Sequence, residues 1–223
     1  MFMLRPSIPS LLCAGLLPWI VSSLRRAQPE STPRNITIDP FQLHYEFLPN
    51  TFGDQSSVIF EGMKIYAKMT EAQAASIGST ELTVATVGFI LVSVPRYPTL
   101  LQIHDVNVRE DCRRNGIATY MITRLLASIK KGWPQVAGAY LAVWPPNDPA
   151  KRAYEKIGFI YVDSVDMINN GQPLRLDGYV FDFKSSAADR LPQDVNPEGM
   201  ELPITAFPVD DQLFYTIIAP QQA

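Results

Sequence analysis

Two arginines and a glycine stand together in the sequence where a helix is predicted to begin. Arg113 and Arg114 precede Gly116, and apolar residues then recur with the helical period from Ile117 onward. A helix N-terminus carries a partial positive charge, so two arginines beside it are unfavourable without a negative partner. A bound anion would resolve this conflict, because free backbone N–H groups, the helix dipole and both guanidinium groups would all attract it.

The residues around this pair leave a second interpretation open. Gly116 would let the backbone approach an anion closely, and Ala118 would keep the next turn uncrowded. Alternatively, Glu110 and Asp111 neutralise the arginines on a solvated turn, and the stretch binds nothing. Charge and spacing alone do not decide between these two interpretations.

Predicted strands and helices on either side must position this stretch. The apolar residues 100–108 predict a strand before it, and the helix after it is expected to end at Gly132. Residues 139–144 predict another strand. A second helix follows, with Asn147 as its capping residue and Gly158 at its end.

The rest of the chain gives weaker patterns. Further strands are predicted at 81–94, 159–167 and 174–183, the last two joined by a hairpin turn at 169–171. Residues 58–69 fit a strand or a helix equally well. Residues 28–57, rich in Pro, Asn, Ser and Thr, predict a long connection with short ordered pieces.

Both ends of the chain differ from the middle. The apolar run 8–21 is interrupted by prolines, and its helical spacing favours a packed helix first, an interfacial anchor second and a signal sequence third. The tail 185–223 is acidic and proline-rich, and its apolar piece 213–218 is expected to dock on the body. We expect one domain over residues 1–223, without a membrane span.

Composition excludes several classes of protein. With 223 residues, 47% of them hydrophobic, the chain can bury a sizeable core. The net charge of −3 gives no support for nucleic-acid binding, and two cysteines exclude a disulfide scaffold. Two histidines give no support for a zinc site, so no metal is expected. Reduced cysteines are typical of a cytoplasmic protein.

Two motifs resemble the GNAT superfamily of acyl-CoA-dependent N-acyltransferases. Residues 113–118 satisfy the family signature Gln/Arg-x-x-Gly-x-Gly/Ala, and residues 147–159 resemble its second motif. Together the motifs cover residues 81–183, whereas residues 1–57 match poorly. The resemblance implies an α/β fold with a mixed, mostly antiparallel twisted sheet flanked by helices. That sheet would splay between the strands at 100–108 and 139–144.

The resemblance also implies acetyl-CoA as co-substrate. Backbone amides would hold the pyrophosphate at Arg113, Arg114, Asn115, Gly116, Ile117 and Ala118. The pantetheine arm would pair like an added strand with Val106, Asn107 and Val108. Further contacts are expected at Asn147, Ala150 and Tyr154, although Asn147 has an alternative role as a helix cap.

The implied reaction is attack of a neutral amine on the thioester carbonyl. By resemblance Tyr154 is the candidate acid for the leaving thiolate, although a tyrosine on an apolar helical stripe is ordinarily a core residue. His104 and Asp105 are candidate bases for the amine, and a chain of waters could replace both. As neighbours on a strand they are expected to face opposite sides, so that at most one reaches the reaction centre.

Three functions remain open from the sequence. The first is an N-acetyltransferase that transfers the acetyl group of acetyl-CoA to a primary amine by direct attack in a ternary complex. Its acceptor would be a small-molecule or peptide amine, without nucleic acid. The second is a non-catalytic acyl-CoA-binding or regulatory module with the same fold, and the third is a peripheral membrane protein anchored by residues 8–21.

Overall fold

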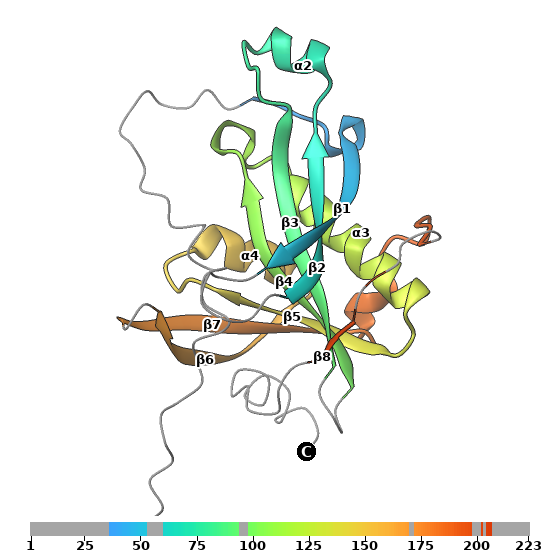
Figure 1. Ribbon diagram of the computed structural model, residues 1–223, viewed down its shortest axis with the longest axis vertical. Helices are drawn as coiled ribbons and strands as arrows, with labels where there is room; N and C mark the ends of the chain where they lie inside the picture. The colour runs from blue at the N-terminus through green and yellow to red at the C-terminus, as the bar shows by residue number, and fades with distance from the viewer. Residues whose placement is uncertain are drawn as a thin grey trace, which may run out of the picture.

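The computed structural model describes residues 36–52, 60–93, 98–169, 172–197, 202 and 204–206. The predicted helix at 8–21 and the apolar piece at 213–218 lie outside these described residues. Within them the chain forms one mixed sheet with helices packed against it (Figure 1).

The sheet contains eight strands in the order β1-β2-β3-β4-β5-β7-β6, with β8 paired to β3. The strands are β1 (His44–Phe52), β2 (Phe60–Lys68), β3 (Thr83–Ser93), β4 (Thr99–Val108), β5 (Val136–Val143), β6 (Ile160–Asn169), β7 (Gln172–Asp182) and β8 (Ile204–Ala206). Only the β4–β5 and β3–β8 pairs are parallel. The expected mixed, mostly antiparallel sheet is therefore confirmed.

Three α-helices and three short 3-10 helices complete the described fold. They are α2 (Glu71–Ser76), α3 (Ile117–Gly132), α4 (Asp148–Ile157), η2 (Pro40–Gln42), η3 (Glu110–Cys112) and η4 (Ser186–Arg190). The helices α3 and α4 lie on the same face of the sheet, and their apolar side chains join one core with the strands (Figure 1). Alternate residues of the central strands, such as Leu101 and Ile103 on β4, point into this core.

The two parallel central strands separate at their C-terminal ends. Pairing between β4 and β5 runs from Thr99↔Val136 to Gln102↔Tyr140 and goes no further. Beyond that point β4 keeps its partner β3, and β5 keeps its partner β7. Figure 1 shows β6 and β7 running across the direction of β2, β3 and β4. The predicted splay is confirmed, and it opens along residues 103–108 and 141–143.

The N-terminal part of the fold differs most from expectation. The predicted long connection at 28–57 is wrong at its end, because residues 44–52 form β1 at the edge of the sheet. An edge strand tolerates Pro49, which misled the prediction. Within the ambiguous stretch 58–69, residues 60–68 form the strand β2. The sequence also did not predict α2, which begins with a capping box between Thr70 and Gln73.

The first part of the acidic tail packs along α3. The Nζ atom of Lys130 donates to the carbonyl oxygen of Ala188 (3.1 Å), and that of Lys131 to the carbonyl oxygen of Val195 (2.8 Å). Arg124 forms an ion pair with Asp194. This segment is therefore part of the folded body, as far as residue 197.

Candidate functional site

The turn between β4 and α3 contains two residues in the left-handed backbone region. Arg114 has a φ of 68° and Gly116 a φ of 75°. Such alternation can turn successive backbone N–H groups toward one side, which forms a concave site for an anion. A Cβ atom at Gly116 would meet nothing within 4 Å, so the space beside this backbone is open.

The start of α3 offers unused hydrogen-bond donors. Its N-cap is Gly116, with no side-chain cap and no acidic residue in the first turn. The first intrahelical hydrogen bond runs from the N–H of Tyr120 to the carbonyl oxygen of Gly116 (2.9 Å). In the described part of the chain, the N–H groups of residues 117–119 have no acceptor. This helix end therefore presents donors and positive dipole to an open space.

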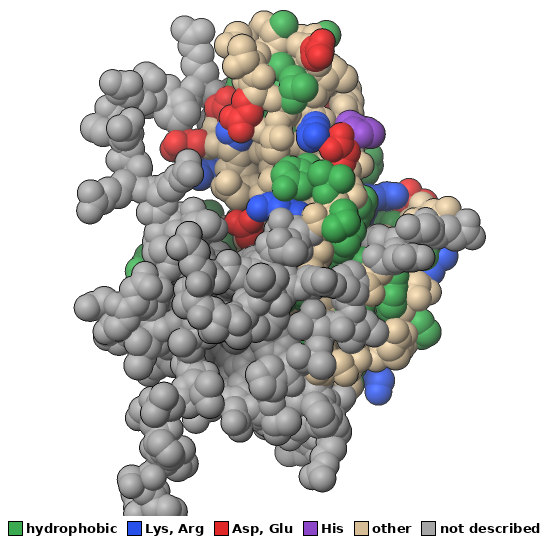
Figure 2. Space-filling model, viewed as in Figure 1, with side chains coloured by type: hydrophobic (Ala, Val, Ile, Leu, Met, Phe, Trp, Pro, Cys, Tyr) green, Lys and Arg blue, Asp and Glu red, His purple; other side chains and the backbone are tan. Residues whose placement is uncertain are grey.

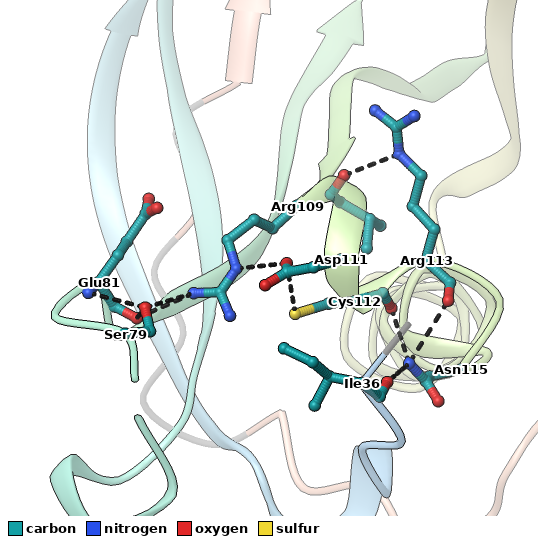
Figure 3. Close-up of polar contacts among 9 residues, drawn as sticks. Ile36, Ser79, Glu81, Arg109, Asp111, Cys112, Arg113 and Asn115 are labelled. Carbon is teal, nitrogen blue, oxygen red and sulfur yellow. Dashed lines mark hydrogen bonds and ion pairs between the residues drawn. The ribbon is translucent and has the colours of Figure 1, made fainter. Parts of the chain in front are cut away.

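The acidic residues of the turn do not neutralise the arginines nearest the helix. Asp111 Oδ1 accepts from Nε of Arg109 at 2.7 Å, and Arg109 also donates to the carbonyl oxygen of Glu81 at 2.9 Å (Figure 3). Arg113 is exposed and donates to the carbonyl oxygen of Val108. Among the residues that the structure describes, neither Arg113 nor Arg114 forms an ion pair with a carboxylate. The geometry favours the anion interpretation over the solvated turn.

Asn115 has a structural role that the sequence did not reveal. Its Nδ2 donates to the carbonyl oxygens of Ile36 (2.7 Å) and Cys112 (3.0 Å) (Figure 3). Its Oδ1 accepts from the N–H of Ile38 (3.2 Å). The side chain therefore ties residues 36–38 to the turn, and a ligand contact of Asn115 would come from its backbone. Burial, followed by the hydrogen bond to Asp111, raises the pKa of the Cys112 thiol to about 11, so it stays protonated.

The strand residues 106–108 lie at the splay, as the sequence predicted. Val106 and Val108 pack against the core, whereas the side chain of Asn107 is exposed. On one side β4 pairs with β3 along these residues. On the other side its pairing with β5 ends at Gln102, before residue 106 is reached. In the described chain the Val108 carbonyl oxygen accepts from Arg113, and the other backbone groups on the β5 side are open to an added strand-like ligand.

At the start of α4 the side chain of Asn147 caps the helix. Its Oδ1 accepts from the N–H of Ala150 at 3.3 Å, and Ala150 itself packs against the core. The cap leaves the Nδ2 donor of this exposed residue available, so capping and ligand binding are compatible.

Tyr154 lies on the inner face of α4 with 6% of its surface exposed. Its ring contacts those of Phe159 and Tyr179, at centroid distances of 6.0 and 6.4 Å. Burial raises the pKa of its hydroxyl, so the group keeps its proton at neutral pH. Within the described ranges no side chain or backbone group hydrogen-bonds this hydroxyl. The residue is thus a core tyrosine whose polar end has bonding capacity left.

His104 and Asp105 do not alternate across the strand as expected. Asp105 has a φ of 48°, and the β3–β4 register shifts beside it, so this point of β4 is a bulge. Both side chains consequently approach Lys64 on β2. Asp105 forms an ion pair with Lys64, and the positive charge of Lys64 lowers the pKa of His104. The expectation that the two face opposite sides is wrong, because the bulge breaks the alternation of the strand.

The environment of His104 makes it a weak base. Its imidazole lies against Gly88, where an added Cβ would be 2.5 Å from Cε1 of His104. Burial, with the charge of Lys64 as a second cause, lowers the pKa of His104 to about 3. Sequence reasoning missed Lys64, whose only signal was a cation in the middle of a largely apolar strand.

The described residues lack features of two other kinds of site. They contain no helix that is both long and apolar enough to cross a membrane. They also contain no group of three or more His, Cys, Asp or Glu side chains that could hold a metal ion.

Comparisons with known proteins agree with the motifs. The model of the acetyltransferase (GNAT) family matches residues 41–159. Arabidopsis thaliana NAA60 in complex with acetyl-CoA is 24% identical, with a TM-score of 0.45 over 56% of this chain and 77% of that one. A spermidine N-acetyltransferase SpeG chimera from Vibrio cholerae and hSSAT is 14% identical, with a TM-score of 0.43 over 58% and 70%.

A third solved structure is the NatC complex bound to Gag peptide and CoA. It is 15% identical, with a TM-score of 0.43 over 53% of this chain and 70% of that one. A search of curated proteins gave no match. Since the family model spans more than half of the sequence, the chain belongs to the acetyltransferase (GNAT) family.

Proposed function

We propose that this protein transfers the acetyl group of acetyl-CoA to a primary amine by direct attack in a ternary complex. The observation that carries the proposal is the start of α3, where open space, unused N–H groups and two arginines without carboxylate partners coincide in the described chain. Acetyl-CoA fits this place because its pyrophosphate is the kind of anion that such a helix end binds. Membership of the acetyltransferase family supports the same ligand.

The chain's own residues would hold the co-substrate in two places. Backbone amides of residues 113–118 would bind the pyrophosphate, with Arg113 and Arg114 as charged partners. The free edge of β4 at 106–108 would pair with the amides of the pantetheine arm, with a further contact from Nδ2 of Asn147. When bound, acetyl-CoA supplies an activated thioester. Ala150 and Tyr154 on α4 would border that part of the site.

Two proton transfers are assigned to side chains. The hydroxyl of Tyr154 would protonate the departing thiolate, since burial keeps it protonated at neutral pH. The proton of the attacking amine would pass to Asp105, to His104 or to a water. The pKa of His104 near 3 counts against this histidine, because so weak a base retains a proton poorly near neutral pH, and Asp105 or a water is left as the acceptor. A backbone N–H at 106–108 would stabilise the oxyanion.

The acceptor is proposed to be a small-molecule or peptide amine. Solved structures similar to this chain include one with a bisubstrate analogue and one with a Gag peptide, and another is a spermidine acetyltransferase chimera. A panel should therefore contain polyamines, free amino acids, peptides with free N-termini and lysine peptides blocked at their N-termini. Release of the CoA thiol, measured for each amine, identifies the class.

Binding of acetyl-CoA is the first test of the proposal. At a hundredfold excess over its dissociation constant, the ligand should stabilise the fold by about 2.7 kcal/mol, seen as a higher melting temperature. No shift at millimolar acetyl-CoA would contradict the proposal.

The second candidate is a non-catalytic acyl-CoA-binding module. The position of Tyr154 in the aromatic core favours it, because a tyrosine of raised pKa is a weaker acid. Binding of acetyl-CoA without acetylation of any amine in the panel would support the module. Turnover of one amine above the rate of thioester hydrolysis would exclude it.

A further inference from the structure

A non-glycine residue in the left-handed region stands in the middle of a central strand. Asp105 has a φ of 48°, which is uncommon for any residue with a side chain. Its carboxylate forms an ion pair with Lys64, and the two side chains are only 16% and 19% exposed. We infer that Lys64 is a positioning residue: its ion pair with Asp105 holds the β4 bulge in place, and the bulge sets the backbone of residues 106–108 at the splay.

Lys64 reaches Asp105 across the strand between them. Lys64 on β2 is paired with Gly88 on β3, and Gly88 with His104 on β4. Because Gly88 has no side chain, the imidazole of His104 lies against its backbone, in space that a Cβ atom would fill. The lysine therefore extends over a strand that has no side chain at this point, and its ammonium group meets the bulge from the β2 side.

The bulge decides which residues of β4 face the core. Before it, Leu101 and Ile103 point into the core; after it, Val106 and Val108 do. Strict alternation would instead have turned Asp105 and Asn107 inward, since a slip of one residue moves every later side chain to the other face. The extra residue keeps valines in the core and leaves Asn107 exposed.

The inference rests on the proposed acetyl-CoA site, because residues 106–108 are the proposed partners of the pantetheine arm. A bulge that is free to shift would move their N–H and C=O groups along the open edge of β4. Loss of Lys64 should therefore weaken acetyl-CoA binding, even though β3 and β4 separate the strand of this lysine from β5 in the sheet.

Lys68 provides a matched control on the same strand and face. Its Nζ is 2.6 Å from Oε2 of Glu46, and their side chains are 32% and 33% exposed. This ion pair joins β2 to β1 and does not reach β4. Figure 2 shows acidic and basic side chains interspersed over the upper part of the displayed face, where β1 and β2 lie in Figure 1.

The test compares Lys64→Met with Lys68→Met. Calorimetric titration with acetyl-CoA should show an affinity roughly tenfold lower for Lys64→Met, equivalent to about 1.4 kcal/mol, and unchanged for Lys68→Met. Amide hydrogen exchange without ligand should be faster at residues 104–108 in Lys64→Met only. A merely structural lysine would lower the melting temperature and leave the affinity of the folded protein unchanged, which would overturn the inference.

A second variant tests the cause of the effect. In Lys64→Met/Asp105→Gly the carboxylate that would have lost its lysine is also gone, and glycine adopts the left-handed conformation readily. This double variant should recover wild-type affinity within about threefold, whereas a double variant as weak as Lys64→Met would refute the role of the bulge. If Lys64→Met does not fold, Asp105→Asn replaces it, because it removes the charge at nearly constant size.

The outcomes also separate this inference from the proposed function. A wild-type protein that binds no acetyl-CoA contradicts the proposed function, and hydrogen exchange at 104–108 then still tests the ion pair. A wild-type protein that binds acetyl-CoA, together with a Lys64→Met variant equal to it in affinity and exchange, overturns the inference alone.

Discussion

The helices α3 and α4 begin in opposite ways. At α4, Asn147 accepts a hydrogen bond from the N–H of Ala150, and Asp148 adds a negative charge in the first turn. At α3, Gly116 provides no side-chain cap, the first turn has no acid, and arginines precede it. The start of α4 is satisfied by its own sequence, whereas the N–H groups at the start of α3 have no acceptor in the described chain, which is why we propose an anion there.

The fold can accept an unfavourable helix start because α3 is stabilised elsewhere. A good N-cap contributes about 0.5–2 kcal/mol, a contribution that α3 lacks. Its inner face, however, buries eight residues between Ile117 and Ile129. Packing of that kind is the main source of helix stability in proteins. A helix that is stabilised by core packing can therefore leave its N-terminal N–H groups to a ligand.

The largest effect on acetyl-CoA binding is expected when a side chain fills the open space beside Gly116 at the start of α3. Gly116→Glu should abolish acetyl-CoA binding, because the side chain would occupy the pyrophosphate space and add like charge. Gly78→Glu is the matched control: Gly78 has a φ of 69° and, like Gly116, no atom within 4 Å of an added Cβ. Both variants should lose similar stability, but only Gly116→Glu should lose binding in calorimetry. Equal affinity of the two variants would place the anion site elsewhere.

The next effect concerns the chemistry proposed for α4. Tyr154→Phe removes only a hydroxyl, so kcat should fall by roughly 10²–10⁴, the usual contribution of a positioned acid. Affinity for acetyl-CoA should change little, since the hydroxyl acts mainly in the transition state. Tyr179→Phe, in the neighbouring buried ring, serves as the control. Normal turnover in a well-folded Tyr154→Phe variant would refute the acid role.

Replacing the two arginines should raise the stability of the ligand-free protein and lower its affinity for acetyl-CoA. Without ligand, Arg113→Gln/Arg114→Gln should stabilise the fold by about 0.3–1 kcal/mol for each charge, because cations oppose the dipole of α3. With acetyl-CoA, the same variant should bind roughly tenfold more weakly, since charge-assisted hydrogen bonds are lost. Melting temperatures with and without ligand measure both effects. Arg152→Gln, an exposed cation within α4, should produce neither change.

The smallest effect on stability and affinity is expected at α4, the helix that Asn147 caps. Asn147→Ala should lower the stability by about 1 kcal/mol, with or without acetyl-CoA, because the cap is lost in both states. Asn147→Asp keeps the capping oxygen and removes only the Nδ2 donor. A loss of affinity in Asn147→Asp without a loss of stability would show that this donor contacts the pantetheine arm. If both properties stay unchanged, Asn147 is only a cap.

Local signals in the sequence were sufficient to predict the helices α3 and α4 and the β6–β7 hairpin. The helical period predicted α3, the Asn and Gly caps predicted α4, and the turn at 169–171 predicted the β6–β7 hairpin. In each case the residues that specify the element lie within it or directly at its ends. The left-handed backbone conformation of Gly116 agrees with its residue type and with its place before the helix.

Features that depend on distant partners could not be predicted in this way. The bulge at Asp105 requires both the register with β3 and the ion pair with Lys64, which lies 41 residues earlier in the chain. Asn115 has no special local pattern, and its role depends on Ile36 and Ile38. Residues 44–52 have the composition of a connection, and they form a strand because they pair with β2.

The short strand β8 has a consequence for solubility. On one side β3 pairs with β2 as far as Phe89, and β8 continues that side along Leu91, Val92 and Ser93. Without β8, these backbone groups would form an open sheet edge of apolar character, which can recruit a strand from another molecule. Three residues of the tail thus cover this part of β3, and a chain cut before Ile204 is expected to expose the edge and to self-associate more readily.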